Sequence, residues 1–213
     1  MSEELDIYDA SLRPLGKMDR DEVHRTGQWH RTFHCWIVDI TRLRILFQTR
    51  SLITKTHPGK LDISAAGHLA AGESVADGVR EIAEELGITV TVDDLISAGE
   101  RVEVSDSPSG IKNREYQSVY FLTTHHDLFE FSPDPSEVAG LAALPIAEAI
   151  DLFSGRVPFI EVDTVSVEAN GSLIPGRRRI EVADFIPRIQ RYYLAATIAA
   201  ERVSAGKRDI AIS

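Results

Sequence analysis

The chain has 213 residues, of which 43% are hydrophobic and 26% are charged, and its formal net charge is -10. This length and hydrophobic content are enough for one globular domain with its own core. The negative charge argues against non-specific binding to nucleic acid or to an anionic membrane surface, although a bound cation would still allow a phosphorylated substrate.

The first third of the chain alternates short strand patterns with polar turns. The pattern predicts a strand over residues 5–8 followed by a turn at 13–16, and then an aromatic, β-branched strand over 32–40. A strand over 44–49 is expected to pair with the strand before it, and residues 61–66 lead as a further strand into a glycine-rich loop.

A helix is predicted over residues 74–86. Ser74 and Asp77 have the spacing of a capping box, and Gly87 is a natural residue for the end of a helix. Apolar residues at helical spacing predict its buried stripe: Val75, Val79, Ile82 and Leu86.

The second half of the chain predicts more strands and a short helix. Two strands over 98–104 and 116–123 are joined by a turn within residues 105–113, SDSPSGIKN. A further strand is expected over 137–144, and a short helix over 147–153.

The C-terminal part predicts a hairpin and a long closing helix. The hairpin joins 159–167 to 172–174 around Asn170-Gly171, and the helix spans 182–203 with Pro187 near its start. We expect its apolar residues to pack on the sheet of the same chain, with a homodimer contact as the alternative. These residues are Phe185, Ile189, Tyr192, Tyr193 and Ile198. Strands and helices mix without strict βαβ alternation, which predicts an α+β fold with a mixed sheet between helices.

Acidic residues cluster on one face of the helix predicted at 74–86. Glu81 precedes Glu84 by three residues and Glu85 by four, and Arg80 lies four residues before Glu84, where it can orient a carboxylate. Such a cluster is usually a solvated surface. Here it follows a loop with Gly67 and Gly72, which permit close backbone approach, so a carbonyl oxygen could join the carboxylates. Oxygen ligands from a helix and a loop suit Mg²⁺ or Mn²⁺ completed by substrate phosphates.

Residues 67–88, GHLAAGESVADGVREIAEELGI, resemble the Nudix box, Gly-x5-Glu-x7-Arg-Glu-U-x-Glu-Glu-x-Gly-U, where U is aliphatic. The matching positions are Gly67, Glu73, Arg80, Glu81, Ile82, Glu84, Glu85, Gly87 and Ile88. The segment REIAEELGI is intact. Six residues rather than seven separate Glu73 from Arg80, which leaves the role of Glu73 open.

The resemblance implies a Nudix-like α/β/α sandwich. In one domain over 1–213, residues 1–30 would be an N-terminal strand and turn extension, 31–155 the Nudix core, and 156–213 a C-terminal hairpin and helix. It also implies a hydrolase that cleaves a diphosphate linkage in a nucleoside diphosphate derivative or related small molecule.

The same resemblance implies roles for single residues. Glu81, Glu84, Glu85 and the Gly67 carbonyl would bind Mg²⁺ (or Mn²⁺), and Arg80 would hold the glutamates in place. Glu73 would support them. The family draws its general base from varied places, so the candidates are Glu85, Glu81 and Glu115.

Residues 24–39 and 107–121 also resemble isopentenyl diphosphate isomerase, a relative with the same fold. This resemblance implies metal binding by His24, His30 and His68 and a catalytic role for Glu115. Ala66 stands where the isomerase requires a cysteine, and Asn113 stands where it has another glutamate. We therefore expect hydrolysis, with an isomerase-like enzyme or a non-catalytic ligand-binding protein as alternatives. The histidines are expected to be structural or to hydrogen-bond a substrate phosphate, and a second metal site is the alternative.

The cysteine content and hydropathy predict the compartment. Cys35 is the single cysteine, which excludes an internal disulfide and fits a reducing compartment. There is no run of about 18 apolar residues, and the first ten residues are acidic and polar. We therefore expect a cytoplasmic protein with no membrane-spanning helix and no signal peptide.

Overall fold

The centre of the fold is a nine-stranded mixed sheet, seen in a computed structural model that describes residues 3–107 and 110–212. Its strand order is β11-β10-β9-β4-β3-β8-β7, with short strands β5 and β6 paired to β4 and β3. Strands β1 and β2 form a separate two-stranded sheet. The strands are β1 Glu4–Tyr8, β2 Pro14–Asp19, β3 His30–Asp39, β4 Arg44–Arg50, β5 Leu61–Asp62, β6 Ala65–His68, β7 Ile96–Asp106, β8 Lys112–Thr124, β9 Val138–Pro145, β10 Ile160–Val167 and β11 Leu173–Ile180. The α-helices are α1 Arg20–Thr26, α2 Arg80–Leu86, α3 Ile146–Ser154 and α4 Tyr192–Ser204.

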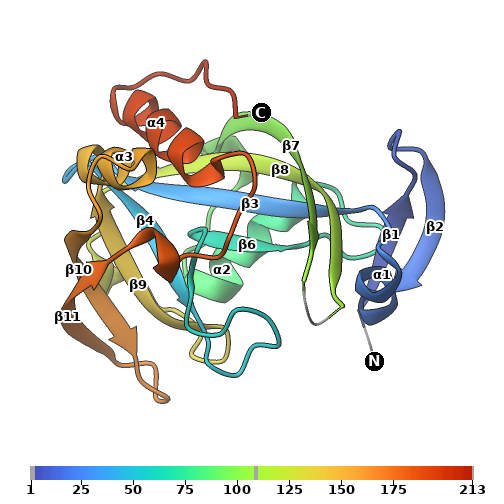
Figure 1. The fold of residues 1–213 in the computed structure, drawn as a ribbon, viewed down its shortest axis with the longest axis horizontal. Coiled ribbons are helices and arrows are strands. Elements are labelled where there is room, and N and C mark those ends of the chain that lie inside the picture. The colour runs from blue at the N-terminus through green and yellow to red at the C-terminus, as the bar shows by residue number, and fades with distance from the viewer. Residues whose placement is uncertain (1–2, 108–109, 213) are drawn as a thin grey trace.

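Helices cover both faces of the large sheet (Figure 1). Alternate side chains of β3 point to opposite faces. Trp36 packs in a core with residues of α3 and α4, and we call this side the α4 face. Phe33 packs in a second core with Ile82 of α2, and we call this side the α2 face. The arrangement confirms the predicted α+β, Nudix-like sandwich.

The predicted strands of the core are present, and several are longer than expected. β7 and β8 extend beyond 98–104 and 116–123, and β11 runs well beyond 172–174. The turn expected within 105–113 joins β7 to β8, although its residues 108 and 109 lie outside the described residues. β8 pairs with β3 in parallel, which places His30 beside Glu115.

The long helix predicted over 182–203 is wrong. α4 begins at Tyr192, and the chain before it forms a 3-10 turn, Val182–Asp184, followed by a segment without regular structure. Pro187 explains the break, because proline has no N–H to donate and its ring clashes with the preceding turn of a helix. Phe185, Tyr192 and Tyr193 are buried in the core, as expected for packing within the chain, whereas Ile189 and Ile198 are exposed and do not pack on the sheet.

The helix predicted over 74–86 is shorter than expected. α2 begins at Arg80, after a 3-10 turn over Asp77–Val79. The Asp77 carboxylate accepts hydrogen bonds from the backbone N–H and the hydroxyl of Ser74, so these residues stabilise a turn rather than the first turn of the α-helix. Gly87 ends α2 in the left-handed conformation, as predicted.

Three local predictions near the N-terminus and before the glycine loop need correction. The turn expected at 13–16 lies earlier, where Asp9 accepts hydrogen bonds from Ser11 and Arg13, and β2 starts at Pro14. Helix α1 was not predicted, although Asp19 caps its start. The strand expected over 61–66 is divided into β5 and β6, because the Ser64 side chain bonds to neighbouring strands instead.

Candidate functional site

The short strand β6 separates two groups of side chains. Ala66 packs on the α4 face, whereas Gly67 lies against Glu81 of α2. The carboxylate cluster, defined as Glu81, Glu84 and Glu85, therefore lies on the α2 face. The histidine cluster, defined as His24, His30 and His68, lies on the other side of the same strand.

The carboxylate cluster lies over the backbone of β6. A Cβ atom placed on Gly67 would be 2.0 Å from the carboxylate carbon of Glu81, so only glycine allows this close approach. The Oε2 atom of Glu85 accepts hydrogen bonds from the Ala66 N–H at 2.9 Å and from Gln48 at 3.1 Å. Glu84 is the exposed member, with 58% of its side chain accessible. The cluster near Gly67 therefore has two buried carboxylates, Glu81 and Glu85, and one exposed carboxylate, Glu84.

Arg80 of α2 connects the helix to the loop that precedes it through hydrogen bonds and ion pairs. Its guanidinium donates to Glu73 at 2.9 Å and to Glu84 at 2.8 Å, and it contacts Glu81 at 2.8 Å. It also donates to the backbone carbonyl of His68 at 3.1 Å. Glu73 in turn accepts from the Ala70 N–H at 2.7 Å. The structure therefore places Glu73 behind Arg80, as a residue that fixes the loop.

The carboxylate cluster brings together acidic groups whose ionised forms the protein alone does not stabilise. Burial raises the pKa of Glu81 to about 7 even though Arg80 opposes the shift, and Glu84, Glu137 and Glu3 add repulsion. Burial also raises the pKa of Glu85 well above its usual range. Buried, mutually repelling carboxylates of this kind fit a bound cation. Sequence reasoning missed Gln48 and Glu137, because both lie outside the motif.

The three histidines converge, although they come from α1, β3 and β6. One ring nitrogen from each lies within 4.8 Å of the other two, and the Nε2 atoms of His24 and His68 are 3.2 Å apart. The His30 Nδ1 atom is 3.0 Å from the Gln28 carbonyl, which fixes its proton there and leaves Nε2 buried without a partner among the described atoms. Burial lowers the pKa of His24 and His68, which favours their neutral, ligating form.

Glu115 belongs to the histidine side of the site. It lies opposite His30 in the parallel pairing of β3 and β8, and its Oε2 atom accepts from Gln117 at 2.6 Å. Among the candidates for the general base, Glu81 and Glu85 therefore lie in the carboxylate cluster, whereas Glu115 does not. The donor set of the histidine cluster suits a divalent transition metal such as Zn²⁺.

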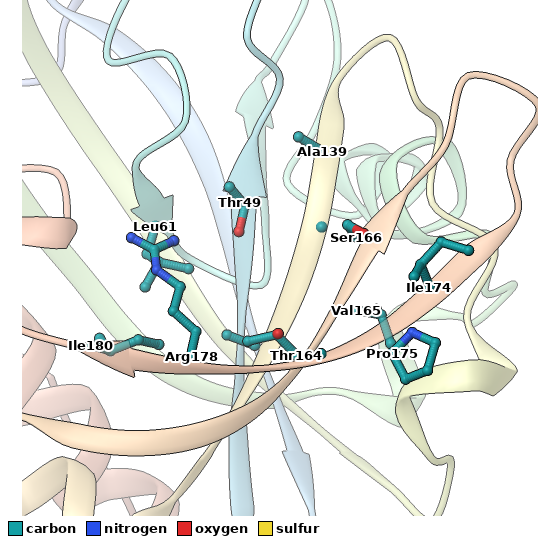
Figure 2. Close-up of a pocket in the computed structure, with 13 residues that line it drawn as sticks. Thr49, Leu61, Ala139, Thr164, Val165, Ser166, Ile174, Pro175, Arg178 and Ile180 are labelled. Carbon is teal, nitrogen blue, oxygen red and sulfur yellow. The ribbon is translucent and has the colours of Figure 1, made fainter.

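A separate cavity of about 210 Å³ lies on the α4 face across β4, β9, β10 and β11 (Figure 2). Thr49, Thr164, Ser166 and Arg178 line it. Arg178 is bound to Asp184 at 2.7 Å, and none of the predicted site residues borders the cavity. The cavity is therefore separate from the two clusters around β6.

The sequence predicts that no helix spans a membrane, and the helices of the structure agree with this prediction. None of the helices in residues 3–107 and 110–212 has the length and apolar content needed to cross a membrane.

A mixed sheet between helices, with a glutamate-rich helix behind a glycine turn, defines a Nudix-type protein. The family model of the NUDIX domain matches residues 28–162, and the chain belongs to this family. An uncharacterized Nudix hydrolase of Clostridium acetobutylicum is 34% identical over 196 residues, which cover 91% of this chain and 95% of that protein. Nudix hydrolases act on nucleoside diphosphate derivatives and generally use divalent metal ions.

Two further comparisons concern the isomerase resemblance and the fold. The isopentenyl-diphosphate Delta-isomerase of Streptomyces coelicolor is 32% identical over 147 residues, which cover 68% of this chain and 72% of that enzyme. The crystal structure of DR0079 from Deinococcus radiodurans aligns with a TM-score of 0.53 at 22% identity, covering 72% of this chain and 90% of that one. The structural likeness shows the fold.

Proposed function

We propose that the protein is a divalent-metal-dependent hydrolase that cleaves a diphosphate linkage in a nucleoside diphosphate derivative or a related small molecule. The observation that carries this proposal is the pair of buried carboxylates, Glu81 and Glu85, packed over the Gly67 turn. Arg80 contacts Glu81, Glu84 and Glu73, and one guanidinium cannot neutralise three carboxylates.

Each residue has a defined part in this reaction. Glu81, Glu84, Glu85 and the Gly67 carbonyl hold the cation, for which we propose Mg²⁺ or Mn²⁺. When bound, such an ion neutralises phosphate charge and lowers the pKa of a bound water. Arg80 keeps the carboxylates in place and docks the loop through His68. Glu81 or Glu85 accepts the proton of the attacking water, and Glu115 is the third candidate if the substrate reaches across β6.

The histidine cluster favours a second candidate function, an isomerase-like reaction on an isoprenoid diphosphate. His24, His30 and His68 offer neutral nitrogen ligands with Glu115 beside them. The methyl group of Ala66 cannot exchange a proton, and Asn113 carries no carboxylate. We therefore rank hydrolysis first and propose that the histidine cluster binds a second metal ion or a substrate phosphate.

A substrate panel separates these functions from a protein that binds without reacting. It contains nucleoside diphosphate derivatives, dinucleoside polyphosphates and isopentenyl diphosphate, each with Mg²⁺ or Mn²⁺. Release of a nucleoside monophosphate supports hydrolysis, and isomerised product supports the second function. Tight binding without turnover would contradict both.

Metal affinity should depend on pH near neutrality. The pKa of Glu81 is raised to about 7, so a cation that binds below this pH must displace a proton. We expect the affinity for Mg²⁺ to fall by about tenfold in total as the pH is lowered from 8 to 6, with most of the loss below pH 7. Calorimetric titration in buffers of different ionisation enthalpy gives both affinity and proton release. Equal affinity at pH 8 and pH 6 contradicts the assignment.

Glu73→Gln should cost much less activity than changes in the carboxylate cluster. Glu73 bonds to Arg80 and to the Ala70 N–H, and the amide of glutamine can still accept from one of them. We expect kcat to fall by less than about tenfold. Steady-state kinetics of Glu73→Gln and Glu84→Gln, measured together, make the comparison. Losses of the same size would mean that Glu73 has joined the metal ligands.

The wild-type protein should not isomerise isopentenyl diphosphate above background. Ala66→Cys restores one of two missing groups while Asn113 remains, so this variant should also stay nearly inactive, because acid and base groups act as a unit. Its hydrolase activity should survive, since the side chain of Ala66 points to the α4 face. Deuterium incorporation from heavy water into the product, followed by NMR, is the measurement. Incorporation by the wild type would overturn the ranking.

A further inference from the structure

No residue of a described helix lines the cavity on the α4 face. Its 13 lining residues all belong to strands β4, β5, β9, β10 and β11, and its volume is about 210 Å³ (Figure 2). Beside it, Phe47 of β4 packs against Phe153 of α3. From Phe47 the paired residues continue across the sheet through Ala142 and Thr164 to Gly176, and their side chains become small. The cavity is therefore space that small side chains leave open.

Gly176 keeps the cavity open, although the backbone does not require glycine at this position. It lies in the middle of β11 and does not have a positive φ angle, and glycine inside a strand weakens the strand. A Cβ atom placed on Gly176 would be 3.1 Å from the Oγ1 atom of Thr164, so a larger residue would cover that hydroxyl. At Gly140, by contrast, a Cβ atom would be 2.5 Å from the carbonyl oxygen of Val165, so the close approach of β10 requires glycine there. The glycine at position 176 therefore indicates a place where a ligand approaches the strand.

Three hydroxyl groups line the cavity. They belong to Thr49 of β4 and to Thr164 and Ser166 of β10 (Figure 2). Within the residues that the structure describes, none of these hydroxyls donates or accepts a hydrogen bond. Thr49 and Ser166 both pair with Gly140, so they lie on either side of a residue that has no side chain. Since a hydroxyl both donates and accepts, the cavity suits a ligand whose edge carries both kinds of group.

The rest of the lining is apolar or balanced in charge. Arg178 is the one charged residue among the described residues that line the cavity, and it forms an ion pair with Asp184 at 2.7 Å. Since Asp184 already neutralises Arg178, the cavity favours a ligand without net charge. Leu61 and Ile180 are buried and form apolar walls, and Ile174 at the rim is 47% exposed. Apolar walls together with hydroxyls suit a flat ligand whose faces are apolar and whose edge is polar.

The size of the cavity limits the ligand to about one ring system. Its volume of about 210 Å³ lies below the range of about 300–1,000 Å³ for pockets that hold drug-sized molecules. We propose that the cavity binds a small, uncharged heteroaromatic ring, such as a nucleobase, at a site separate from the carboxylate cluster. The faces of the ring pack on Ala142, Leu61 and Ile180, and its edge hydrogen-bonds to the three hydroxyls.

Two other classes of small ligand fit this lining less well. A polyol would place some of its hydroxyls against the apolar walls, where they lose hydrogen bonds to water. A hydrocarbon would leave the hydroxyls of Thr49, Thr164 and Ser166 desolvated and unpaired. The proposal does not depend on the proposed hydrolysis, because the carboxylate cluster lies on the α2 face and the cavity lies on the α4 face.

Free bases test the cavity without engaging the carboxylate cluster, since they carry no diphosphate. Isotope-labelled full-length protein is titrated with adenine, cytosine, ribose and benzene, and the amide signals of Gly140 and Gly176 are followed by NMR. At least one base should bind with a dissociation constant of about 1 mM, which is typical of so few atoms, and at least about fivefold more tightly than ribose or benzene. No base binding below about 10 mM, or equal or tighter binding of ribose or benzene, overturns the proposal.

Gly176→Val tests the role of the missing side chain by filling the cavity. It should weaken base binding by at least about tenfold, and the melting temperature should stay the same or rise because valine favours strands. Thr164→Val keeps the side-chain volume but removes the hydroxyl, so it should weaken base binding by roughly 3- to 10-fold. The matched control is Arg177→Ala, which alters the opposite face of β11 and should leave the affinity unchanged. Unchanged base binding in either cavity variant, or equal weakening by Arg177→Ala, overturns the proposal.

Discussion

Glu81→Gln should lower kcat by at least about a hundredfold, since a divalent ion contributes several kcal/mol of charge stabilisation to this kind of reaction. Glutamine keeps the size and helix propensity of glutamate, so the loss reports the missing charge. Steady-state kinetics at saturating Mg²⁺ measure it. An unchanged kcat at saturating Mg²⁺ would contradict the assignment of Glu81 as a metal ligand.

The same substitution should stabilise the metal-free protein. The folded-state pKa of Glu81 is about 7, above the ordinary value of 4.5, so at pH 8 the ionised carboxylate opposes folding. This penalty shrinks as the pH falls from 7 and is lost only below about 4.5, whereas Glu81→Gln removes it at every pH. We expect the free energy of unfolding at pH 8 without metal to rise by about 1–3 kcal/mol. Denaturant melts of the wild type and the variant in a chelator make the comparison.

Two control variants separate charge loss from general damage. Glu84→Gln should also lower kcat, by roughly a hundredfold, with little change in stability because that side chain is mostly exposed. Glu148→Gln on the exposed side of α3 should change neither quantity. A fall in both stability and activity for Glu81→Gln would indicate structural damage rather than loss of a ligand.

The carboxylate cluster was predictable because its geometry is local. Helical spacing places Glu81, Glu84 and Glu85 near one another, and Gly67 before the helix predicts that the backbone can approach them closely. The bonds of Arg80 to Glu73 were beyond sequence reasoning, because they depend on how a loop with one residue fewer folds back. The start of α2 at Arg80 is part of the same local rearrangement.

The histidine cluster depends on strand pairing, which local patterns do not reveal. The resemblance named His24, His30 and His68, but their convergence requires α1, β3 and β6 to meet. β3 is buried on both faces, so the alternation of Thr32 and His34 with Phe33 and Cys35 in its sequence does not mark one face as a site. Pro187 likewise interrupts a helix that the apolar pattern had favoured, and α4 starts only at Tyr192.

Gly67→Ala should abolish activity while leaving the fold intact. The added Cβ would lie 2.0 Å from the carboxylate carbon of Glu81, so the Glu81 side chain must move away from β6. The group that moves is the far end of a flexible side chain, and Gly67 does not have a positive φ angle. We therefore expect a stability change below about 1 kcal/mol but a loss in kcat of at least about a hundredfold, similar to that of Glu81→Gln.

A double-mutant cycle tests whether the effect of Gly67→Ala passes through Glu81. The cycle combines Gly67→Ala with Glu81→Ala and compares kcat, Mg²⁺ affinity and melting temperature for the four proteins. If the methyl group acts by displacing the Glu81 carboxylate, adding Gly67→Ala to Glu81→Ala costs little further activity, because the displaced group is already absent. Losses that multiply would show that the added methyl group also acts independently of the Glu81 side chain, for example by shifting the backbone at residue 67. Wild-type kcat in Gly67→Ala would contradict the close packing of β6 against α2 on which the metal site depends.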